Sequence, residues 1–539
     1  MKKLRAACLP GLVRSICAGL LLGSGGPPAA RAAIPATAPA GTPAGTPPGT
    51  PLGTPAGTPS VTIAAARLLD VDTGRYLDRP LVRIDGGTVT EVRQRHPGEP
   101  VTFDLGDQTL LPGLIDCHTH LVGGEEQTPY DSLRQTAARA AIEGVANARA
   151  TLYAGFTTVR DLGSRDLADV ALRDAISAGR IPGPRMFVAV SSVSSTGGHG
   201  DWNDLPPDVV VQRYRAIADG PDAIRHVVRT NLRLGADWIK VFATGGVTSA
   251  NTDPQQADYS EEEIRVAVQT AASRGRDVAV HAHGAAGIIR AARAGVRSIE
   301  HASFLTDEAI AEIRRAGAFI VPNPYTNLYI LERGRAGGFQ DYEIEKSRSV
   351  YHHKLESVRR ALQAGIPVAY GTDSGVQPHG LNARQLGLFV HAGMTPLQAL
   401  QSATLTAARL LRQERRLGRL RPGYVGDVVA VPGDPLRDVR VVEAPTFVFK
   451  DGHLVFARGG AVPAELLPQA WPLPRAGATA TPALPPGPPG PRAAPGYPTA
   501  PSPSPPTAPT LPSPGRPRSP AAGQAPAASG QAPSDVIWR

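Results

Sequence analysis

Short apolar runs that end in polar residues recur through the middle of the chain, and helical patterns separate several of them. The runs cover residues 156–160, 238–242, 278–281, 298–301, 319–322 and 368–373. Helical patterns at 261–274, 285–294 and 354–364 are each followed by a glycine, which is typical of a helix C-terminus. Strand followed by helix, repeated, predicts parallel strands with right-handed crossovers. We therefore expect an α/β fold, a (β/α)8 TIM-like barrel over residues 111–415.

The two ends of this central region have a different pattern. Strand-like segments with hairpin turns lie at 61–69, 82–85 and 101–111, and again at 427–431, 446–450 and 453–456. Strand groups on both sides of a barrel predict one small β-sandwich domain built from residues 61–110 plus 416–460.

The outermost segments are not expected to belong to the folded core. Residues 1–32 have a basic start, a short apolar stretch and Ala30-Arg31-Ala32, which predicts a secretory signal peptide cleaved after Ala32. An uncleaved anchor is the alternative, although the apolar stretch is shorter than a spanning helix needs. Residues 33–60 hold five Gly-Thr-Pro repeats and residues 461–539 are rich in Pro and Ala, so both are expected to be disordered.

Charge and cysteine content narrow the function classes. The net charge is +9, but the arginines are scattered and no basic run is interleaved with aromatics, so nucleic-acid binding is not expected. Cys8 and Cys17 lie in the predicted signal peptide, which leaves Cys117 alone and excludes an internal disulfide in the mature chain. Its side chain should face the core, away from its histidine neighbours.

The first candidate for chemistry is His118-Thr-His120 at the end of the apolar run 110–120, which we expect to be one strand. Residues two apart in a strand point to one face, so both imidazoles can reach one metal ion. Lys240 lies in the apolar run Asp-Trp-Ile-Lys-Val-Phe-Ala. Its side chain either pairs with a carboxylate or is a buried amine whose lowered pKa lets it add CO2. Gly245-Gly246 beyond it would allow the backbone to approach the site closely.

Further polar residues end later runs in the same way. They are His281 and His283, His301, and Asp373. Each alone is compatible with a satisfied core histidine or a capping aspartate. Together, at successive strand ends, they predict the site of a metal-dependent hydrolase.

The order H-x-H, Lys, His, His, Asp at strand ends resembles that of the amidohydrolase superfamily. The strings Ile239-Lys-Val-Phe-Ala-Thr-Gly-Gly, His281-Ala-His-Gly, Ile299-Glu-His-Ala-Ser-Phe and Gly371-Thr-Asp-Ser-Gly look like its imidazolonepropionase-like branch, which includes Xaa-Pro and related dipeptidases. The resemblance covers residues 61–458, including the returning segment from Tyr424.

The resemblance implies a role for each matching position. The implied ligands of two divalent metal ions, zinc by default, are His118, His120 and Asp373 for one ion and His281 and His301 for the other, bridged by an N6-carboxylysine at Lys240. A hydroxide between the ions would be the nucleophile, Asp373 would take its proton, and His283 would polarise the substrate carbonyl or bind its carboxylate.

Two further residues are weighed near the substrate. His199 lies in the Gly-rich string Ser195-Thr-Gly-Gly-His-Gly-Asp after an expected strand at 186–190, and we expect it to contact substrate rather than belong to a simple loop. Tyr325, after Val321-Pro-Asn-Pro, is expected to be a packed turn residue rather than part of the pocket.

These patterns predict a secreted, periplasmic or extracellular, binuclear enzyme that cleaves an amide bond. The expected substrate is a small dipeptide, Xaa-Pro-like or related, or an N-acyl amino acid. Cyclic amides, carboxyl-bearing aryl amides such as ochratoxin, a mononuclear mechanism and a non-catalytic envelope scaffold are the alternatives. No stable membrane insertion is expected, and the pattern leaves open whether the chain forms a homo-oligomer.

Overall fold

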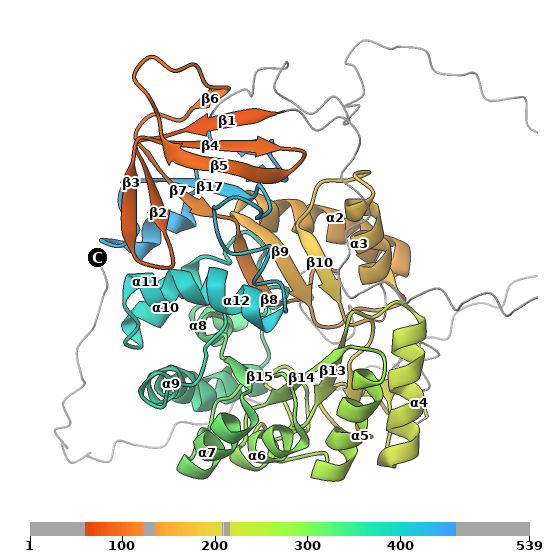
Figure 1. Cartoon of the computed structure of the whole chain (residues 1–539). Helices are drawn as coiled ribbons and strands as arrows, with labels where there is room; N and C mark the ends of the chain where they lie inside the picture. The colour runs from red at the N-terminus through yellow and green to blue at the C-terminus, as the bar shows by residue number, and fades with distance from the viewer. Residues whose placement is uncertain (1–59, 123–132, 134, 207, 210–215, 460–539) are drawn as a thin grey trace, which may run out of the picture. The chain divides into compact units, whose positions relative to one another are not determined.

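The computed structural model describes residues 60–122, 133, 135–206, 208–209 and 216–459 (Figure 1). The predicted signal peptide, the Gly-Thr-Pro repeats and the C-terminal tail lie outside the described residues. Within the described part, none of the helices combines the length and the apolar character that crossing a bilayer requires.

Parallel strands form the middle of the chain. One sheet has the order β10-β9-β8, and a second has the order β12-β11-β13-β14-β15-β16. Their bounds are β8 Leu114–Thr119, β9 Phe156–Asp161, β10 Arg185–Val188, β11 Val193–Ser194, β12 Ala216–Ile217, β13 Trp238–Phe242, β14 Asp277–Ala282, β15 Ser298–His301 and β16 Phe319–Val321. Single parallel bridges, Ile320 to Val368 and Thr119 to Ser374, connect β16 through residues 368–374 to β8. The predicted α/β class is therefore confirmed.

Helices follow most of these strands, and local sequence explains where they begin and end. They are α2 Ala137–Tyr153, α3 Ala168–Ser177, α4 Gly220–Arg233, α5 Glu261–Ala272, α6 Ala285–Ala294, α7 Asp307–Ala316, α8 Pro324–Arg333, α9 Asp341–Gln363, α10 Arg384–His391, α11 Pro396–Gln401 and α12 Ala407–Leu410, with short turns of helix η1 Gly334–Gly337, η2 Ser402–Thr406 and η3 Val439–Glu443. A capping box of Ser260 and Glu263 starts α5. Gly295 ends α6 at φ 86°, a backbone region that favours glycine.

The helix predicted at 354–364 begins earlier than expected. Helix α9 starts at Asp341, because a capping box of Gln340 and Glu343 sets its N-terminus. The buried face of α9 is partly polar before and at the predicted start, since Ser347 and Lys354 occupy positions that face the interior. Polar residues at buried positions weaken the apolar period by which a helix is recognised.

The prediction of one strand over 110–120 is wrong. The chain breaks at Gly113 into β7 (Gln108–Pro112), which pairs antiparallel with a C-terminal strand, and β8, which is parallel to β9. A side chain at Gly113 would collide with Thr157 and Asp427, so the crossing between the two sheets requires glycine. The segment predicted at 368–373 forms only single bridges and is not an assigned strand.

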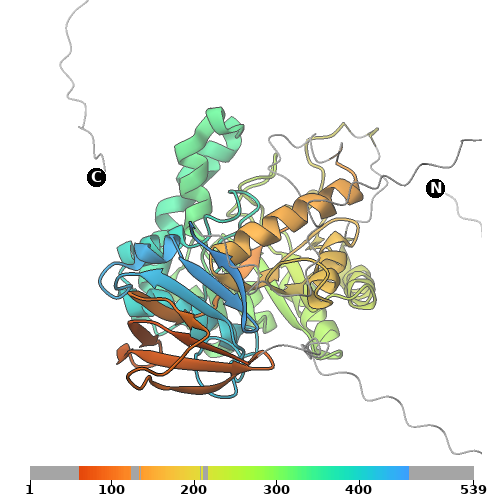
Figure 2. The same ribbon diagram turned by 90° about the horizontal axis from the view of Figure 1, so that it is seen from above.

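The remaining two sheets contain the first strands of the described chain, and one of them also contains its last strands. One has the order β5-β4-β1-β6 and the other β19-β18-β17-β7-β2-β3. Their other bounds are β1 Val61–Ala64, β2 Arg67–Asp70, β3 Arg75–Asp78, β4 Pro80–Asp85, β5 Thr88–Gln94, β6 Phe103–Asp104, β17 Val428–Pro432, β18 Phe447–Lys450 and β19 His453–Ala457. Figures 1 and 2 show the early, red strands beside the late, blue ones. Ile63, Leu110 and Phe449 belong to one buried cluster, which joins the two ends of the region through a common core.

Candidate active site

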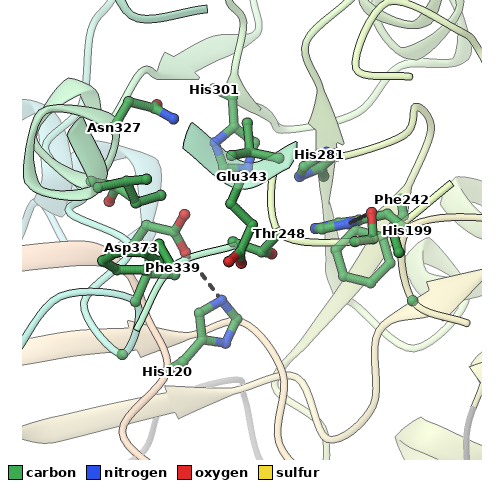
Figure 3. A pocket seen from close by; sticks show the side chains of 18 of the residues that line it. His120, His199, Phe242, Thr248, His281, His301, Asn327, Phe339, Glu343 and Asp373 are labelled. Carbon is green, nitrogen blue, oxygen red and sulfur yellow. Dashed lines mark hydrogen bonds and ion pairs between the residues drawn. The ribbon is translucent and has the colours of Figure 1, made fainter. Parts of the chain in front are cut away.

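The polar residues at the carboxyl ends of the parallel strands line one cavity of about 410 Å3 (Figure 3). All eight residues singled out for the site lie on its wall: His118, His120, His199, Lys240, His281, His283, His301 and Asp373. His118 and Asp373 are more than 250 positions apart in the chain, and the parallel strands bring all eight side chains together. This is the end of a parallel α/β fold where chemistry is expected.

His118, His120 and Asp373 form one group, which we call the acidic trio. Oδ1 of Asp373 lies 3.3 Å from Nε2 of both His118 and His120. The opposite nitrogens are already engaged, because Nδ1 of His118 lies 2.9 Å from the Glu300 carboxylate and Nδ1 of His120 lies 3.1 Å from the Gly163 carbonyl. Each imidazole therefore turns its free nitrogen toward the same point.

His281, His283 and His301 form a second group, the neutral trio. Nδ1 of His283 lies 2.7 Å from Ser303 Oγ, and Nδ1 of His301 lies 2.8 Å from Asn323 Oδ1. Nε2 of His281 is 3.1 Å from the Gly245 carbonyl, which leaves its buried Nδ1 without a hydrogen-bond partner. The rings of His118 and His301 are 5.3 Å apart, so the two trios adjoin.

Lys240 lies at the border of the two trios. Its side chain is buried, and Nζ is 3.3 Å from Nε2 of His118. Burial lowers the pKa of this amine to about 8, against the opposing charges of Glu300 and Asp373. No ion pair joins Lys240 to a carboxylate within the described residues, so the alternative of a paired, snorkelling lysine is not what the structure shows.

The two trios differ in their electrostatics. Burial holds the pKa values of His281, His283 and His301 well below the usual range. Burial also lowers the pKa of His120, but the Asp373 carboxylate outweighs that effect and raises it overall. Burial alone would raise the pKa of Asp373, yet the charge of His118 and the hydrogen bond from His120 lower it. Asp373 is thus an ionised carboxylate whose neighbours are donor atoms for a cation.

Two residues of the trios have a strained backbone. His301 has φ 70° and Asp373 has φ 62°, in the left-handed region that non-glycine residues rarely occupy. Such strain persists only where the surrounding structure imposes it, and it clusters at functional sites.

The remaining predicted residues also have defined positions. His199 stacks on His281 with ring centroids 4.5 Å apart, and its Nδ1 lies 2.8 Å from Ser249 Oγ. A side chain at Gly246 would collide with the His199 ring, which is the close backbone approach expected there. Tyr325 is buried in α8 outside the cavity wall, and Cys117 is fully buried away from the histidines, as predicted.

Sequence reasoning missed four residues that support the trios. Glu300 is fully buried and joins His118 to Arg160, whose Nη2 lies 2.8 Å from the second Glu300 oxygen. Burial would raise the pKa of Glu300, but the Arg160 charge and the His118 hydrogen bond lower it to about 2. Asn323 contacts Nδ1 of His301 through its Oδ1, and Lys354 donates a hydrogen bond to the same oxygen. The position of Glu300 directly before His301 was the one available signal.

Comparisons with known proteins agree with this geometry. The family model described as the amidohydrolase family matches residues 109–455, more than half of the chain. The chain belongs to the amidohydrolase family. It is an enzyme of the class that hydrolyses carbon–nitrogen bonds of amides, with a small-molecule amide as substrate, and the family implies a TIM-like barrel.

Several relatives of this amidohydrolase are known. Ochratoxinase of Aspergillus niger is 35% identical over 368 residues, which cover 64% of this chain and 75% of the relative. The crystal structure of a Xaa-Pro dipeptidase with bound methionine is 34% identical, with a TM-score of 0.69, and the match covers 74% of this chain and all of that one. An imidazolonepropionase of Pyrobaculum arsenaticum is 24% identical over 65% of this chain and 83% of its own.

The residues present fit the metal ions that the family uses. In each trio the potential ligand atoms lie within 4.8 Å of one another. The buried, unpartnered Nδ1 of His281 is the decisive observation, because a buried polar atom without a partner is unfavourable unless something binds it. Imidazole and carboxylate ligands suit zinc and similar divalent ions.

Proposed function

We propose that this amidohydrolase binds two divalent metal ions, zinc by default, and cleaves the amide bond of a dipeptide or an N-acyl amino acid. The carrying observation is the pair of adjoining trios in one cavity, with the buried amine of Lys240 at their border. We further propose that the parallel strands close into a (β/α)8 barrel and that the two mixed sheets, β5-β4-β1-β6 and β19-β18-β17-β7-β2-β3, form a β-sandwich. We also propose that the chain is exported.

Each residue has a proposed role. His118, His120 and Asp373 would hold one ion, His281 and His301 would hold the other, and a carboxylated Lys240 would supply ligand oxygens to both. When bound, the ions supply Lewis-acid activation of the attacking water and of the scissile carbonyl. Neutralising the Lys240 amine favours its carboxylation, because only the neutral amine adds CO2. The new group would offer two oxygens where the neutral trio has no carboxylate of its own.

Proton transfer falls to Asp373. Its carboxylate is ionised and faces the cavity between His118 and His120, so an oxygen is available to take the proton of the attacking water. The same group then donates that proton to the leaving nitrogen, so the amide nitrogen departs as an amine and the proton count balances.

Two histidines are placed to orient the substrate. If Ser303 donates its hydroxyl proton to Nδ1 of His283, Nε2–H of His283 faces the cavity as a donor for the substrate carbonyl or carboxylate. His199 closes the wall beside His281 and is proposed to contact the substrate.

A carboxyl-bearing aryl amide is the second candidate substrate, favoured by the 35% identity to ochratoxinase. A matched panel separates the two: Xaa-Pro and other dipeptides, N-acyl amino acids, and an aryl amide of a carboxyl-bearing amino acid. We expect hydrolysis of at least one class to disappear with a chelator and return with Zn2+, and to be absent in Lys240→Ala. Hydrolysis indifferent to both treatments would contradict the proposal, and no hydrolysis of any member by metal-loaded protein would favour the scaffold alternative.

A further inference from the structure

Asn323 occupies an unusual position between the two trios. It precedes Pro324 at the start of α8, is fully buried, and has φ 36° and ψ 61° in the left-handed region. Asparagine is a preferred helix cap, but its side chain makes no capping hydrogen bond to α8. The side chain turns instead toward His301 and Lys354. A strained residue that forgoes its usual local role indicates a constraint from elsewhere.

Lys354 fixes which way the Asn323 amide faces. Its Nζ lies 3.1 Å from Oδ1 and 3.2 Å from the backbone carbonyl of Asn323. Burial lowers the pKa of Lys354 to about 7, but the amine has at least two N–H donors in either protonation state. These two donors match the two oxygens beside Nζ, the backbone carbonyl and Oδ1 of Asn323, which favours the amide orientation with the oxygen toward Lys354. Lys354 is buried, and within the described residues its hydrogen bonds go to Asn323 and no carboxylate forms an ion pair with it.

The orientation of the amide in turn fixes the proton of His301. Oδ1 of Asn323 is 2.8 Å from Nδ1 of His301, and an amide oxygen only accepts, so the proton of His301 lies on Nδ1. The lone pair of His301 is then on Nε2, the nitrogen that faces the cavity. A flipped amide would present NH2 to Nδ1, move the proton to Nε2 and remove the lone pair that a metal ion needs.

We propose that Lys354 and Asn323 are positioning residues which hold the His301 proton on Nδ1 and thereby set the affinity of the neutral trio for its metal ion. This inference rests on the proposed binuclear function. The relay, by which we mean the hydrogen bonds from Lys354 to Asn323 and from His301 to Asn323, is assigned to the ion of the neutral trio. The acidic trio has its own main support, because the Glu300 carboxylate lies 2.9 Å from Nδ1 of His118, whereas Asn323 Nδ2 makes only a longer contact of 3.3 Å with that nitrogen.

The sign of the effect separates this relay from simple electrostatics. The protonated form of Lys354 repels a nearby cation, so if Lys354 acted only through its charge, Lys354→Met would tighten metal binding, or leave it unchanged where the amine is neutral. If Lys354 acts through the amide, the same variant frees Asn323 to flip and weakens binding at the neutral trio. Asn323→Asp restores an obligatory acceptor, since a carboxylate presents no N–H to His301.

The test is a Co2+ titration of the metal-stripped full chain in the presence of bicarbonate, followed by absorption and by chelator competition. We expect Lys354→Met to weaken binding of the second ion about 10- to 100-fold and to affect binding of the first ion much less. Asn323→Asp in the Lys354→Met background should recover most of that loss. Lys346→Met is the matched control, because Lys346 binds the Gly246 and Ser249 carbonyls and should bind both ions as the wild type does.

Each outcome has a distinct meaning. Unchanged or tighter binding of both ions by Lys354→Met would overturn the relay, as would equal weakening of both ions. If Lys354→Met fails to fold, as judged by its thermal unfolding, the single variant Asn323→Leu decides, because it removes the acceptor for His301 without adding a charge. Binding of the second ion that is weakened more than binding of the first supports the relay, and unchanged binding or an equal change at both ions contradicts it. A wild-type chain that binds fewer than two ions would instead refute the proposed function, and the relay with it.

Discussion

The acidic trio and the neutral trio are both built from side chains at strand ends, but they differ in the charge that they offer to a cation. The acidic trio contains Asp373, and the ionised Glu300 stands directly behind His118. The neutral trio contains no carboxylate, and its partners are Ser303, Asn323 and the Gly245 carbonyl. The amine of Lys354 contacts Oδ1 of Asn323. One half of the site is therefore electrostatically prepared for a cation, and the other half is not.

This difference explains why a lysine lies at the border. Three neutral imidazoles in a buried site bind a cation without balancing its charge, which is unfavourable in a low-dielectric interior. Converting Lys240 from a cation to a carbamate anion changes the local charge by two units. The conversion therefore supplies the negative charge that the neutral trio lacks. We therefore expect the acidic trio to bind its ion first, and metal binding by the neutral trio to depend on Lys240.

The largest expected effect comes from making the acidic trio neutral as well. Asp373→Asn keeps the shape of the side chain but removes the carboxylate that faces both histidines and the proton acceptor of the reaction. We expect kcat/KM to fall by about 10²–10⁴-fold or more, measured on whichever substrate the panel identifies. Asp277→Asn, at the other end of the strand that carries His281, is the control and should keep its activity. A loss of less than about tenfold in Asp373→Asn would remove its catalytic role.

A smaller effect is expected from the support of the acidic trio. Glu300→Gln takes the ionised partner from His118 and leaves Arg160 without its buried ion pair. We expect the first ion to bind about 10- to 100-fold more weakly, and the free energy of unfolding to fall by about 3–5 kcal/mol. Chelator competition and denaturant unfolding measure the two effects. Weaker binding of the second ion alone would show that Glu300 does not support the acidic trio in the way proposed.

The pH dependence of reconstitution tests the neutral trio through Lys240. Its pKa is lowered to about 8 from 10.5, so the neutral amine that adds CO2 predominates above about pH 8. At a fixed concentration of dissolved CO2, we expect the rate at which metal-stripped protein regains activity to rise with pH and to level off above about pH 8. The sign for stability is the same: between pH 8 and 10.5 the unfolded lysine binds a proton that the folded one does not, so stability from this residue increases with pH. A rate that keeps rising to pH 10.5 would contradict the burial effect.

The eight site residues could be predicted because their signal is local. Alternation along a strand places residues two apart on one face, and polar residues that end apolar runs mark the carboxyl edge of a parallel sheet. His118 and His120 could be predicted in this way although the predicted strand was too long: β8 begins at Leu114 and ends at Thr119, directly before His120. The break at Gly113 depends on contacts with Thr157 and Asp427, which no local pattern reports.

The supporting residues could not be predicted because their signal is not local. Glu300 meets Arg160 across 140 positions of sequence and His118 across 182. Lys354 lies in a segment of α9 that reads as a solvent-exposed helix, and only the folded structure shows that it is buried beside Asn323. Partners of this kind control which imidazole nitrogen carries the proton, so the sequence alone leaves the chemistry of the ligands undetermined.

The most direct test of the account is to count metal ions per chain on purified full-length protein while recording a mass spectrum gentle enough to retain a carbamate. The account predicts two equivalents of zinc or a similar ion and the added mass of one CO2 at Lys240, both lost together on acidification. One ion with an unmodified lysine would contradict the role given to Lys240 and indicate a mononuclear mechanism at the acidic trio. Metal-free protein that still hydrolyses amides would contradict the account as a whole.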